Sequence, residues 1–426
     1  MKIDLRYGRS GLPVTLPDVP VEKVLRSRPI ASLSRPQVAL REALARPFGK
    51  GTKPLSEAAR GAKNVLVVIS DITRPVPYPI LLPPLLEILE EEALIPRSRI
   101  LILVATGLHR PNLKDELVEM VGEFVVKEYV IDNHNARDLE SHVEVGLTAR
   151  GTRVLVDRRY VEADFRITTS LIEPHFMAGF SGGPKAICPG LCAAETVGAL
   201  HGATLLECEG VEAGRLEGNP VHDEILSAAR LAGCDYSINV TIDAERHLAG
   251  AFAGELDAAH RAGCKAVEAR VADTVDAPVD IVVTTAAGHP LDSTFYQAIK
   301  GLVLAAPVVK PGGTIVIAAE CKEGLGGSEF SRLVRDFETP QAFLRKIQAA
   351  EGFTVDQWQL QMLCKVLRKA EVVLVSEGLE GQDTAPLGLR RADLVEEAVR
   401  EALIRHGSAA RIVVIPEGPY VLAHCR

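Results

Sequence analysis

The sequence lacks the long apolar segments of a membrane protein. Its apolar runs, such as residues 302–309, are far shorter than the roughly 18 to 20 uncharged residues that span a bilayer. The N-terminal residues, MKIDLRYGRSG, have no apolar core of the kind that marks a signal peptide. We therefore expect a cytoplasmic protein with no membrane partner.

Cysteine and clustered basic residues are also scarce. The eight cysteines include no CxxC pair, and the closest two, Cys188 and Cys192, are at best half of a zinc site. This spacing predicts reduced thiols that pack in the interior. The 48 Lys and Arg are scattered and are outnumbered by 56 Asp and Glu, for a net charge of −8. No nucleic-acid partner is expected.

The chain is too long for one ordinary hydrophobic core, so 426 residues predict two domains. Apolar, β-branched runs of strand length alternate with helical patterns, which is typical of an α/β fold with mostly parallel sheets. The polar, proline-ended stretch DTVDAP, residues 273–278, is the expected linker. We predict two α/β domains, residues 1–275 and 276–426, with an active-site cleft between them.

The expected elements follow from these patterns. A short hairpin is expected at the N-terminus. Strands are expected at residues 64–70, 100–105, 128–132, 165–172, 237–242, 280–285, 313–318, 372–376 and 411–415. Helices are expected at residues 36–45, 54–62, 79–92, 220–232, 256–272 and 294–306.

Polar side chains follow three of the expected strands. Asp71 and Arg74 follow the first, His109 the second, and His175 the run at 165–172. Ligands bind at the carboxyl ends of strands in parallel sheets, so these residues are functional candidates. Taken singly, each is equally suited to a helix cap or a turn.

A glycine-rich turn, Ser181-Gly182-Gly183-Pro184, immediately precedes Lys185. Glycines let the backbone approach a ligand, and a helix start would present N–H groups to an anion. Lys185 is then a charge partner or, if desolvated, a nucleophile. A plain loop with a solvated lysine is the alternative. If Lys185 only binds a phosphate electrostatically, a cofactor would be held noncovalently.

In the second half, Gln297 and Lys300 are three residues apart on one expected helix, and Tyr296 is their neighbour. They form either a polar clamp for a ligand or the exposed face of an amphipathic helix.

Several of these stretches together resemble one family. SDITRPVP (70–77), TGLHR (106–110), EPHFMAGFSGGPKAICPG (173–190), His201 with Gly202, and FYQAIKG (295–301) are similar to the motifs of the LarA-type lactate racemases. The resemblance runs through both halves of the chain in the family's order. It is specific for the family and much weaker for the substrate, because related members act on different 2-hydroxy acids.

The resemblance implies a cofactor and a set of roles. The cofactor is the nickel-pincer nucleotide, a pyridinium-derived mononucleotide that is attached through a thioamide to the lysine matching Lys185. His201 matches the histidine ligand of nickel, and Asp71 matches an acid near the cofactor. Ser181, Gly182 and Gly183 are the expected cofactor-binding turn. Separate cofactor-biosynthesis proteins are implied as partners.

By the same resemblance, His109 and His175 are the acid/base pair, and the substrate is bound by Arg74, Tyr296, Gln297 and Lys300. The implied reaction racemises or epimerises a small, lactate-like 2-hydroxy acid by reversible hydride transfer to the cofactor. Two histidines suit proton transfer near neutral pH, and an arginine suits a carboxylate.

Two other functions remain open. A nicotinamide-dependent 2-hydroxy-acid dehydrogenase would also use histidine and arginine, but no GxGxxG motif follows a strand and opens a helix. A nonenzymatic α/β ligand-binding protein would be expected to lose Lys185 or one of the histidines, and all are present.

Overall fold

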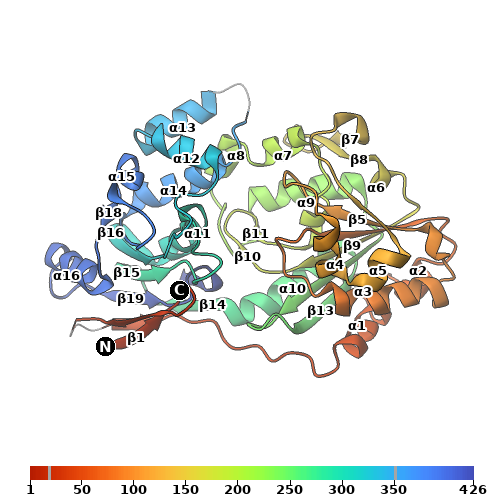
Figure 1. Cartoon of the computed structure of the whole chain (residues 1–426), viewed down its shortest axis with the longest axis horizontal. Helices are drawn as coiled ribbons and strands as arrows, with labels where there is room; N and C mark the ends of the chain where they lie inside the picture. Colours follow the sequence, from red (N-terminus) through yellow and green to blue (C-terminus); the bar gives the residue numbers. More distant parts are fainter. Residues whose placement is uncertain (18–20, 350–352) are drawn as a thin grey trace. The chain divides into compact units, whose positions relative to one another are not determined.

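A computed structural model describes residues 1–17, 21–349 and 353–426. The chain divides into two compact units (Figure 1). The larger unit comprises Pro29–His201 and Glu209–Ala269. The smaller unit comprises Met1–Arg28, Gly202–Cys208 and Arg270–Arg426. Each is described by itself.

The larger unit is built on a six-stranded sheet in the order β13-β12-β9-β4-β5-β6. Its strands are β4 (Val65–Ser70), β5 (Ile100–Ala105), β6 (Val130–Asn133), β9 (Phe165–Leu171), β12 (Tyr236–Ile242) and β13 (Leu248–Gly254). All neighbours pair in parallel except β12 and β13, which form an antiparallel edge. The long apolar runs are therefore strands buried on both faces.

Helices cover this sheet (Figure 1). The main core joins Val65, Val67 and Ile69 of β4 to apolar side chains of four helices. These are α1 (Pro36–Ala45), α3 (Tyr78–Glu87), α4 (Lys114–Val121) and α5 (Glu123–Glu128). The other helices of this unit are α2 (Leu55–Ala58), α6 (Arg158–Val161), α7 (Ala194–Leu200), α9 (Pro220–Ala232) and α10 (Leu256–Val271). Short strands complete it: β7 (His142–Leu147), β8 (Arg153–Asp157), β10 (Pro174–His175) and β11 (Gly179–Phe180).

The strand order of the larger unit reverses beside β4. From β4 the chain moves outward to β5 and β6, and it then returns to place β9 on the other side of β4. In parallel sheets, ligands bind where the chain departs in opposite directions from two neighbouring strands. The residues after β4 and β9 therefore form the expected binding edge.

The smaller unit has a second six-stranded sheet, in the order β18-β17-β16-β15-β19-β3, with all neighbours parallel. Its strands are β3 (Val21–Val24), β15 (Val279–Thr285), β16 (Val309–Ala318), β17 (Glu371–Val375), β18 (Arg390–Arg391) and β19 (Ile412–Ile415). The hairpin of β1 (Lys2–Leu5) and β2 (Leu12–Thr15) and the pair of β14 (Ala272–Val275) and β20 (Leu422–Cys425) complete the strands of this unit.

Alternate residues of this sheet enter two cores, as the period of two in a strand requires. Val282 and Ile315 pack with helices α11 (Phe295–Ala305), α12 (Ser328–Arg335), α13 (Pro340–Ala349) and α14 (Gln357–Lys369). Ile281 and Val316 pack with α16 (Val395–His406) and the β1–β2 hairpin. Helices α8 (Ala203–Glu207) and α15 (Gly381–Thr384) are the remaining two.

The predicted fold class, mixed α/β with mostly parallel sheets, is confirmed. The compact units, however, do not follow a single division near residue 275. Residues 1–28 belong with the C-terminal sheet because β3 pairs with β19. The stretch expected to be a linker at 273–278 begins with β14, which pairs with β20.

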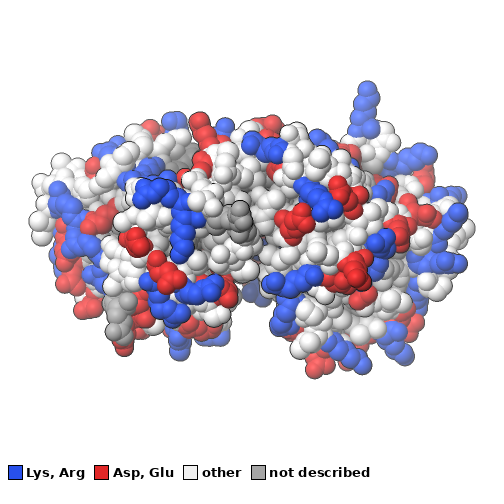
Figure 2. Space-filling view, turned by 90° about the horizontal axis from the view of Figure 1, so that it is seen from above, with Lys and Arg blue, Asp and Glu red and all other residues white. Residues whose placement is uncertain are grey.

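None of the described helices combines the length and apolarity needed to cross a membrane. Lys and Arg are interspersed with Asp and Glu on the face shown in Figure 2, with no continuous basic patch.

Candidate active site

Asp71 and His109 come together at the carboxyl ends of β4 and β5. His109 Nδ1 lies 2.7 Å from Asp71 Oδ2. The Thr73 hydroxyl donates to Asp71 Oδ1 at 2.8 Å. The Asp71 carboxylate is buried, whereas 56% of the His109 side chain is exposed. The carboxylate orients the ring and holds a hydrogen on Nδ1, which leaves Nε2 as the nitrogen that accepts a proton.

His175 has the opposite tautomer. It lies on β10, and its Nδ1 accepts the backbone N–H groups of Met177 at 3.3 Å and Ala178 at 3.2 Å. A nitrogen that accepts two N–H groups carries no hydrogen, so the neutral ring is protonated at Nε2. The ring also stacks on Phe176, with centroids 5.2 Å apart. In the neutral forms, His109 therefore presents a bare Nε2 and His175 presents an Nε2–H group.

The glycine-rich turn packs against the sheet without room for side chains. Gly183 has φ +51°, and a Cβ there would lie 2.4 Å from His260 Cγ. Its N–H donates to Asn239 Oδ1 at 2.7 Å. The Ser181 hydroxyl donates to the Leu171 carbonyl and accepts the Glu173 N–H, each at 2.8 Å. Ser181 thus holds the turn on β9, and the expected helix after Pro184 is one short 3₁₀ turn, Gly183–Ala186.

Lys185 follows this turn and is partly buried. Burial, and then the positive charge of Arg74, lowers the pKa of Lys185 to about 8, although Cys188 acts in the opposite direction. A substantial neutral fraction near neutral pH makes this amine a nucleophile. Arg74 itself is exposed, in the turn after β4.

His201 caps the C-terminus of α7, and its Nδ1 lies 2.8 Å from the Val197 carbonyl. Burial lowers the pKa of His201 to about 4; the Val197 bond opposes this shift and the charge of Lys185 adds to it. The ring is therefore neutral at pH 7. Because Nδ1 must donate to the carbonyl, Nε2 has the lone pair that a metal ligand requires.

Tyr296, Gln297 and Lys300 lie in the smaller unit, on α11. Burial raises the pKa of Tyr296, whose ring packs edge-on against Phe330 with centroids 5.2 Å apart. Gln297 Oε1 is buried and has no hydrogen-bond partner among the described residues. A buried amide oxygen in that state favours a ligand that donates a hydrogen bond.

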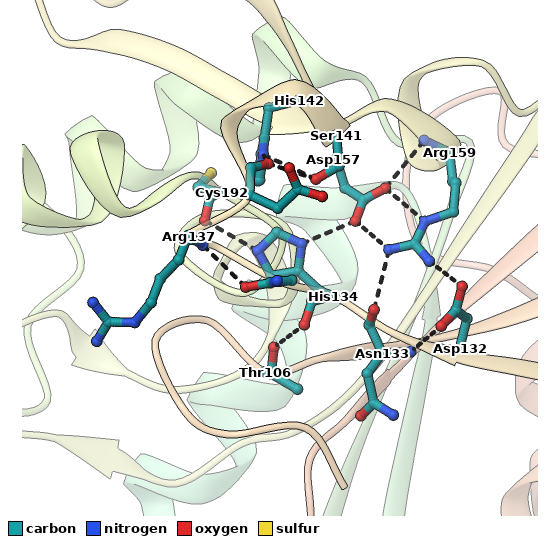
Figure 3. Close-up of polar contacts among 12 residues, drawn as sticks. Thr106, Asp132, Asn133, His134, Arg137, Ser141, His142, Asp157, Arg159 and Cys192 are labelled. Atoms are coloured by element: carbon teal, nitrogen blue, oxygen red, sulfur yellow. Dashed lines mark hydrogen bonds and ion pairs between the residues drawn. The ribbon is translucent and has the colours of Figure 1, made fainter.

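A buried polar network was missed by the sequence analysis (Figure 3). His134 Nδ1 lies 2.9 Å from Asp157 Oδ2, and Nε2 lies 3.1 Å from the Cys192 carbonyl. Both neighbours are acceptors, so both hydrogen bonds form together only when the ring carries two hydrogens. Arg159 donates to the same carboxylate through Nε at 2.9 Å and Nη2 at 2.6 Å, and it also pairs with Asp132.

Burial alone would raise the pKa of Asp157, but hydrogen bonds from Arg159 and His134 hold it well below its usual range. The network also supports the site. Thr106, at the end of β5, donates to the His134 carbonyl at 2.8 Å, and the Gly107 N–H donates to the Gly190 carbonyl at 3.0 Å. It therefore joins the loop of His109 to the segment after Lys185. In the sequence, the feature that could have identified this network is the position of His134 directly after the strand β6.

The remaining candidates for metal binding are two cysteines and one cluster in a turn. Cys188 and Cys192 are both buried, as predicted for packing residues. In the described part of the chain, one group of three potential metal ligands occurs, Asp243, Glu245 and His247, in the turn between β12 and β13. Asp243 Oδ1 there already accepts the backbone N–H groups of Glu245 and His247.

Comparison with known proteins agrees with this arrangement. Residues 7–214 match the lactate racemase N-terminal domain, and residues 274–423 match the lactate racemase C-terminal domain. The lactate racemase of Thermoanaerobacterium thermosaccharolyticum is 34% identical over 425 residues, covering 99% of this chain and 98% of the relative. That of Lactiplantibacillus plantarum is 37% identical over 370 residues, covering 86% and 87%.

The structure of the lactate racemase apoprotein from T. thermosaccharolyticum superposes with a TM-score of 0.93 at 33% identity, covering 99% of this chain and all of that one. A Thermotoga maritima protein, 19% identical with a TM-score of 0.66, shares the fold. The relatives named lactate racemases place this α/β protein among the isomerases. The chain belongs to the lactate racemase family, as the motifs predicted.

Proposed function

We propose that this protein racemises a small 2-hydroxy acid, with lactate as the first substrate to test. The observation that carries the proposal is the pair of opposite tautomers, His109 with a basic Nε2 and His175 with a protonated Nε2. Racemisation needs one group that removes the hydroxyl proton and another, in the case of histidine the imidazolium form, that returns a proton to the oxygen after the carbon has inverted. The relatives named lactate racemases supply the substrate class.

The residues present suit the nickel-pincer nucleotide that the family resemblance implies. Lys185 offers a partly neutral amine for covalent attachment, and His201 offers a neutral imidazole, an ordinary ligand for Ni(II). When bound, this cofactor supplies the acceptor for the substrate hydride. Asp71 would keep His109 oriented beside it.

Substrate binding is assigned by the same proposal to Arg74, Tyr296, Gln297 and Lys300. Arg74 offers a guanidinium that matches a carboxylate with two hydrogen bonds, and Lys300 a second positive charge. The buried Oε1 of Gln297 is suited to accept a hydrogen bond from a donor group of the bound ligand.

The test is to make the protein in a host that contains the cofactor-biosynthesis proteins and to measure intact mass, nickel content and the mass of the Lys185 peptide. We expect one nickel-bearing nucleotide adduct on Lys185 and conversion of either lactate enantiomer into the other without added nicotinamide. Lys185→Arg keeps the charge but removes the nucleophile, so it should carry no adduct.

An unmodified, nickel-free protein, obtained while a known lactate racemase is loaded in the same host, would refute the cofactor assignment. Loaded protein that acts on neither lactate enantiomer would instead refute lactate as substrate, and a screen of other single-enantiomer 2-hydroxy acids would follow. Production of a keto acid that depends on added nicotinamide would favour the dehydrogenase.

A further inference from the structure

We propose that the smaller unit binds a small anion, bearing phosphate groups or several carboxylates, at the carboxyl ends of β15 and β19. A cavity of about 630 Å³ lies there. Four segments line it: residues 4–11 at the N-terminus, Arg26 after β3, the loop after β15 at Ala287–His289, and Pro416 with Glu417 after β19. Its volume lies within the range of small-molecule sites, roughly 300 to 1,000 Å³.

The position of this cavity is the one at which parallel sheets bind ligands. From β15 the chain moves to β16, β17 and β18 on one side, and it then returns to place β19 on the other side of β15. The strand order therefore reverses between β15 and β19, and their loops leave in opposite directions. In the larger unit, the reversal between β4 and β9 is where Asp71 and Lys185 lie. The smaller unit thus has its own binding edge, and the α11 residues that the proposed racemase function uses, Tyr296, Gln297 and Lys300, are not among those that line the cavity.

The charge of the cavity indicates the class of ligand. Arg6, Arg9 and Arg26 line it. None of the three guanidinium groups forms an ion pair within the described part of the chain, whereas many other arginines do, such as Arg411 with Glu22. Guanidinium groups match phosphate and carboxylate oxygens with paired hydrogen bonds.

Two acids, Asp4 and Glu417, also line the cavity. The Glu417 carboxylate already accepts hydrogen bonds from the hydroxyl of Ser27 at 2.5 Å and from its backbone N–H at 3.3 Å. The arginines therefore outnumber the acids, and His289 adds a further donor. A ligand with more than one negative charge best complements this set.

The walls of the cavity are held in place before any ligand binds. The His289 N–H donates to the Gly8 carbonyl at 2.9 Å, and the Gly8 N–H donates to the buried Asp292 Oδ2 at 2.6 Å. Gly288 has φ +73°, and a Cβ there would lie 2.9 Å from the Gly8 oxygen. A preformed site loses little entropy when it binds.

One wall residue also has strained backbone. Ala287 has φ +70°, in the left-handed region that non-glycine residues rarely adopt. Such residues cost of order 1 kcal/mol and cluster at ligand sites. The strain is an observation independent of the arginines and of the strand order.

The proposal is tested by calorimetric titration of the folded protein with pyrophosphate and, separately, with citrate, at an ionic strength held constant with sodium chloride. We expect saturable binding of at least one of the two. Binding of pyrophosphate alone would identify a phosphate ligand, and binding of citrate alone a carboxylate ligand. The double variant Arg9→Gln/Arg26→Gln should raise the Kd of the bound anion by more than roughly tenfold.

Arg345→Gln is the matched control, because Arg345 is also exposed, lies on α13 of the same unit and is outside the cavity. The control should bind as the parent does, and unfolding temperatures establish that all variants fold. Absence of saturable binding for both anions, or unchanged affinity in the double variant, would overturn the proposal. Because neither Arg9 nor Arg26 has a role in racemisation, failure here leaves the racemase proposal standing.

Discussion

Single ring nitrogens decide the chemistry that the larger unit can perform. Asp71 holds a hydrogen on Nδ1 of His109, and two backbone N–H groups keep Nδ1 of His175 without one. The residue type alone does not fix which ring nitrogen carries the hydrogen, because the same histidine with other hydrogen-bond partners would have the other tautomer. Residues of the same type therefore differ in tautomer, which is set by their immediate hydrogen-bond partners.

Replacing the orienting carboxylate tests the role of His109. In Asp71→Asn, an amide can donate to Nδ1, which would move the ring hydrogen to Nε2 and remove the base. We expect the turnover of the loaded enzyme to fall by roughly 10² to 10⁴, with little change in KM. Steady-state kinetics from each lactate enantiomer, at matched nickel content, would measure this.

Thr73→Val is the control for Asp71→Asn, because it removes only the hydroxyl that donates to Asp71 Oδ1. Its effect should be less than roughly tenfold, the size of one ordinary hydrogen bond. An Asp71→Asn enzyme with the parent's turnover would show that the carboxylate does not set the His109 tautomer.

At the scale of elements, the His134 network joins the loops after β5 and β6 to the segment around Cys192 that follows the Lys185 turn (Figure 3). His134 and Asp157 are completely buried. The imidazole ring places one nitrogen beside each acceptor, whereas glutamine has a single NH₂ group. A glutamine at position 134 therefore cannot donate to both the Asp157 carboxylate and the Cys192 carbonyl. Breaking a buried charged pair of this kind costs about 3 to 5 kcal/mol.

We therefore expect His134→Gln to destabilise the larger unit by about that amount in urea, and to speed hydrogen exchange of the Gly107 amide, which donates to Gly190. His247→Gln is the matched control, since His247 also pairs with an aspartate but is 66% exposed. Unchanged stability and unchanged exchange of the Gly107 amide in His134→Gln would contradict the supporting role of the network.

The elements that sequence patterns predicted well have strong local signals. Helix α1 matches its expected bounds at 36–45, with Pro36 in its first turn, and α9 matches at 220–232, where Asn219 caps the backbone N–H groups. Strands β4 and β5 follow from continuous apolar runs. Each of these signals lies within the element itself or one residue from it.

Elements that depend on distant partners were not predictable in this way. β3 and β14 have short, partly exposed sequences and exist because they pair with β19 and β20, more than a hundred residues away. β13, LAGAFAG, is rich in alanine and glycine, and it is a strand because it pairs with β12. The same reason kept His134, Asp157 and Arg159 out of the predicted site, since their contacts form only after the sheet is folded.

At the scale of the whole molecule, acid stability is governed by histidines buried in the neutral form. His222 and His260 stack with ring centroids 5.8 Å apart beneath the Lys185 turn, where His260 Nε2 lies 2.9 Å from the Ser181 carbonyl. Burial is the main reason that the pKa of each is lowered to about 4. The charge of His260 further lowers the pKa of His222, and the positive charge of Arg261 lowers the pKa of both rings. His201 has a similar shift.

The sign of the pH dependence follows from these shifts. A histidine in the unfolded chain has a pKa of about 6.5, so between pH 6.5 and 4 the unfolded state binds more protons than the folded state. The stabilisation is complete above pH 6.5 and is lost as the pH falls toward 4, by roughly 3 kcal/mol for each fully buried ring. Asp157 adds a loss only at lower pH, below the ordinary range of a carboxyl group.

We therefore expect the urea concentration at which the α9 and α10 segments unfold to decrease progressively from pH 7.5 to 6.0 and 5.0. Hydrogen exchange of these segments would measure the change. His222→Gln should flatten this dependence, because one proton fewer is taken up on unfolding, and His260→Gln provides a second variant if the first does not fold. His247→Gln, changed at an exposed ring, should keep the parent's slope. A stability that does not vary across this interval would mean that the two buried rings titrate as they do in the unfolded chain, and the packing of His260 against Gly183 would then have no electrostatic consequence.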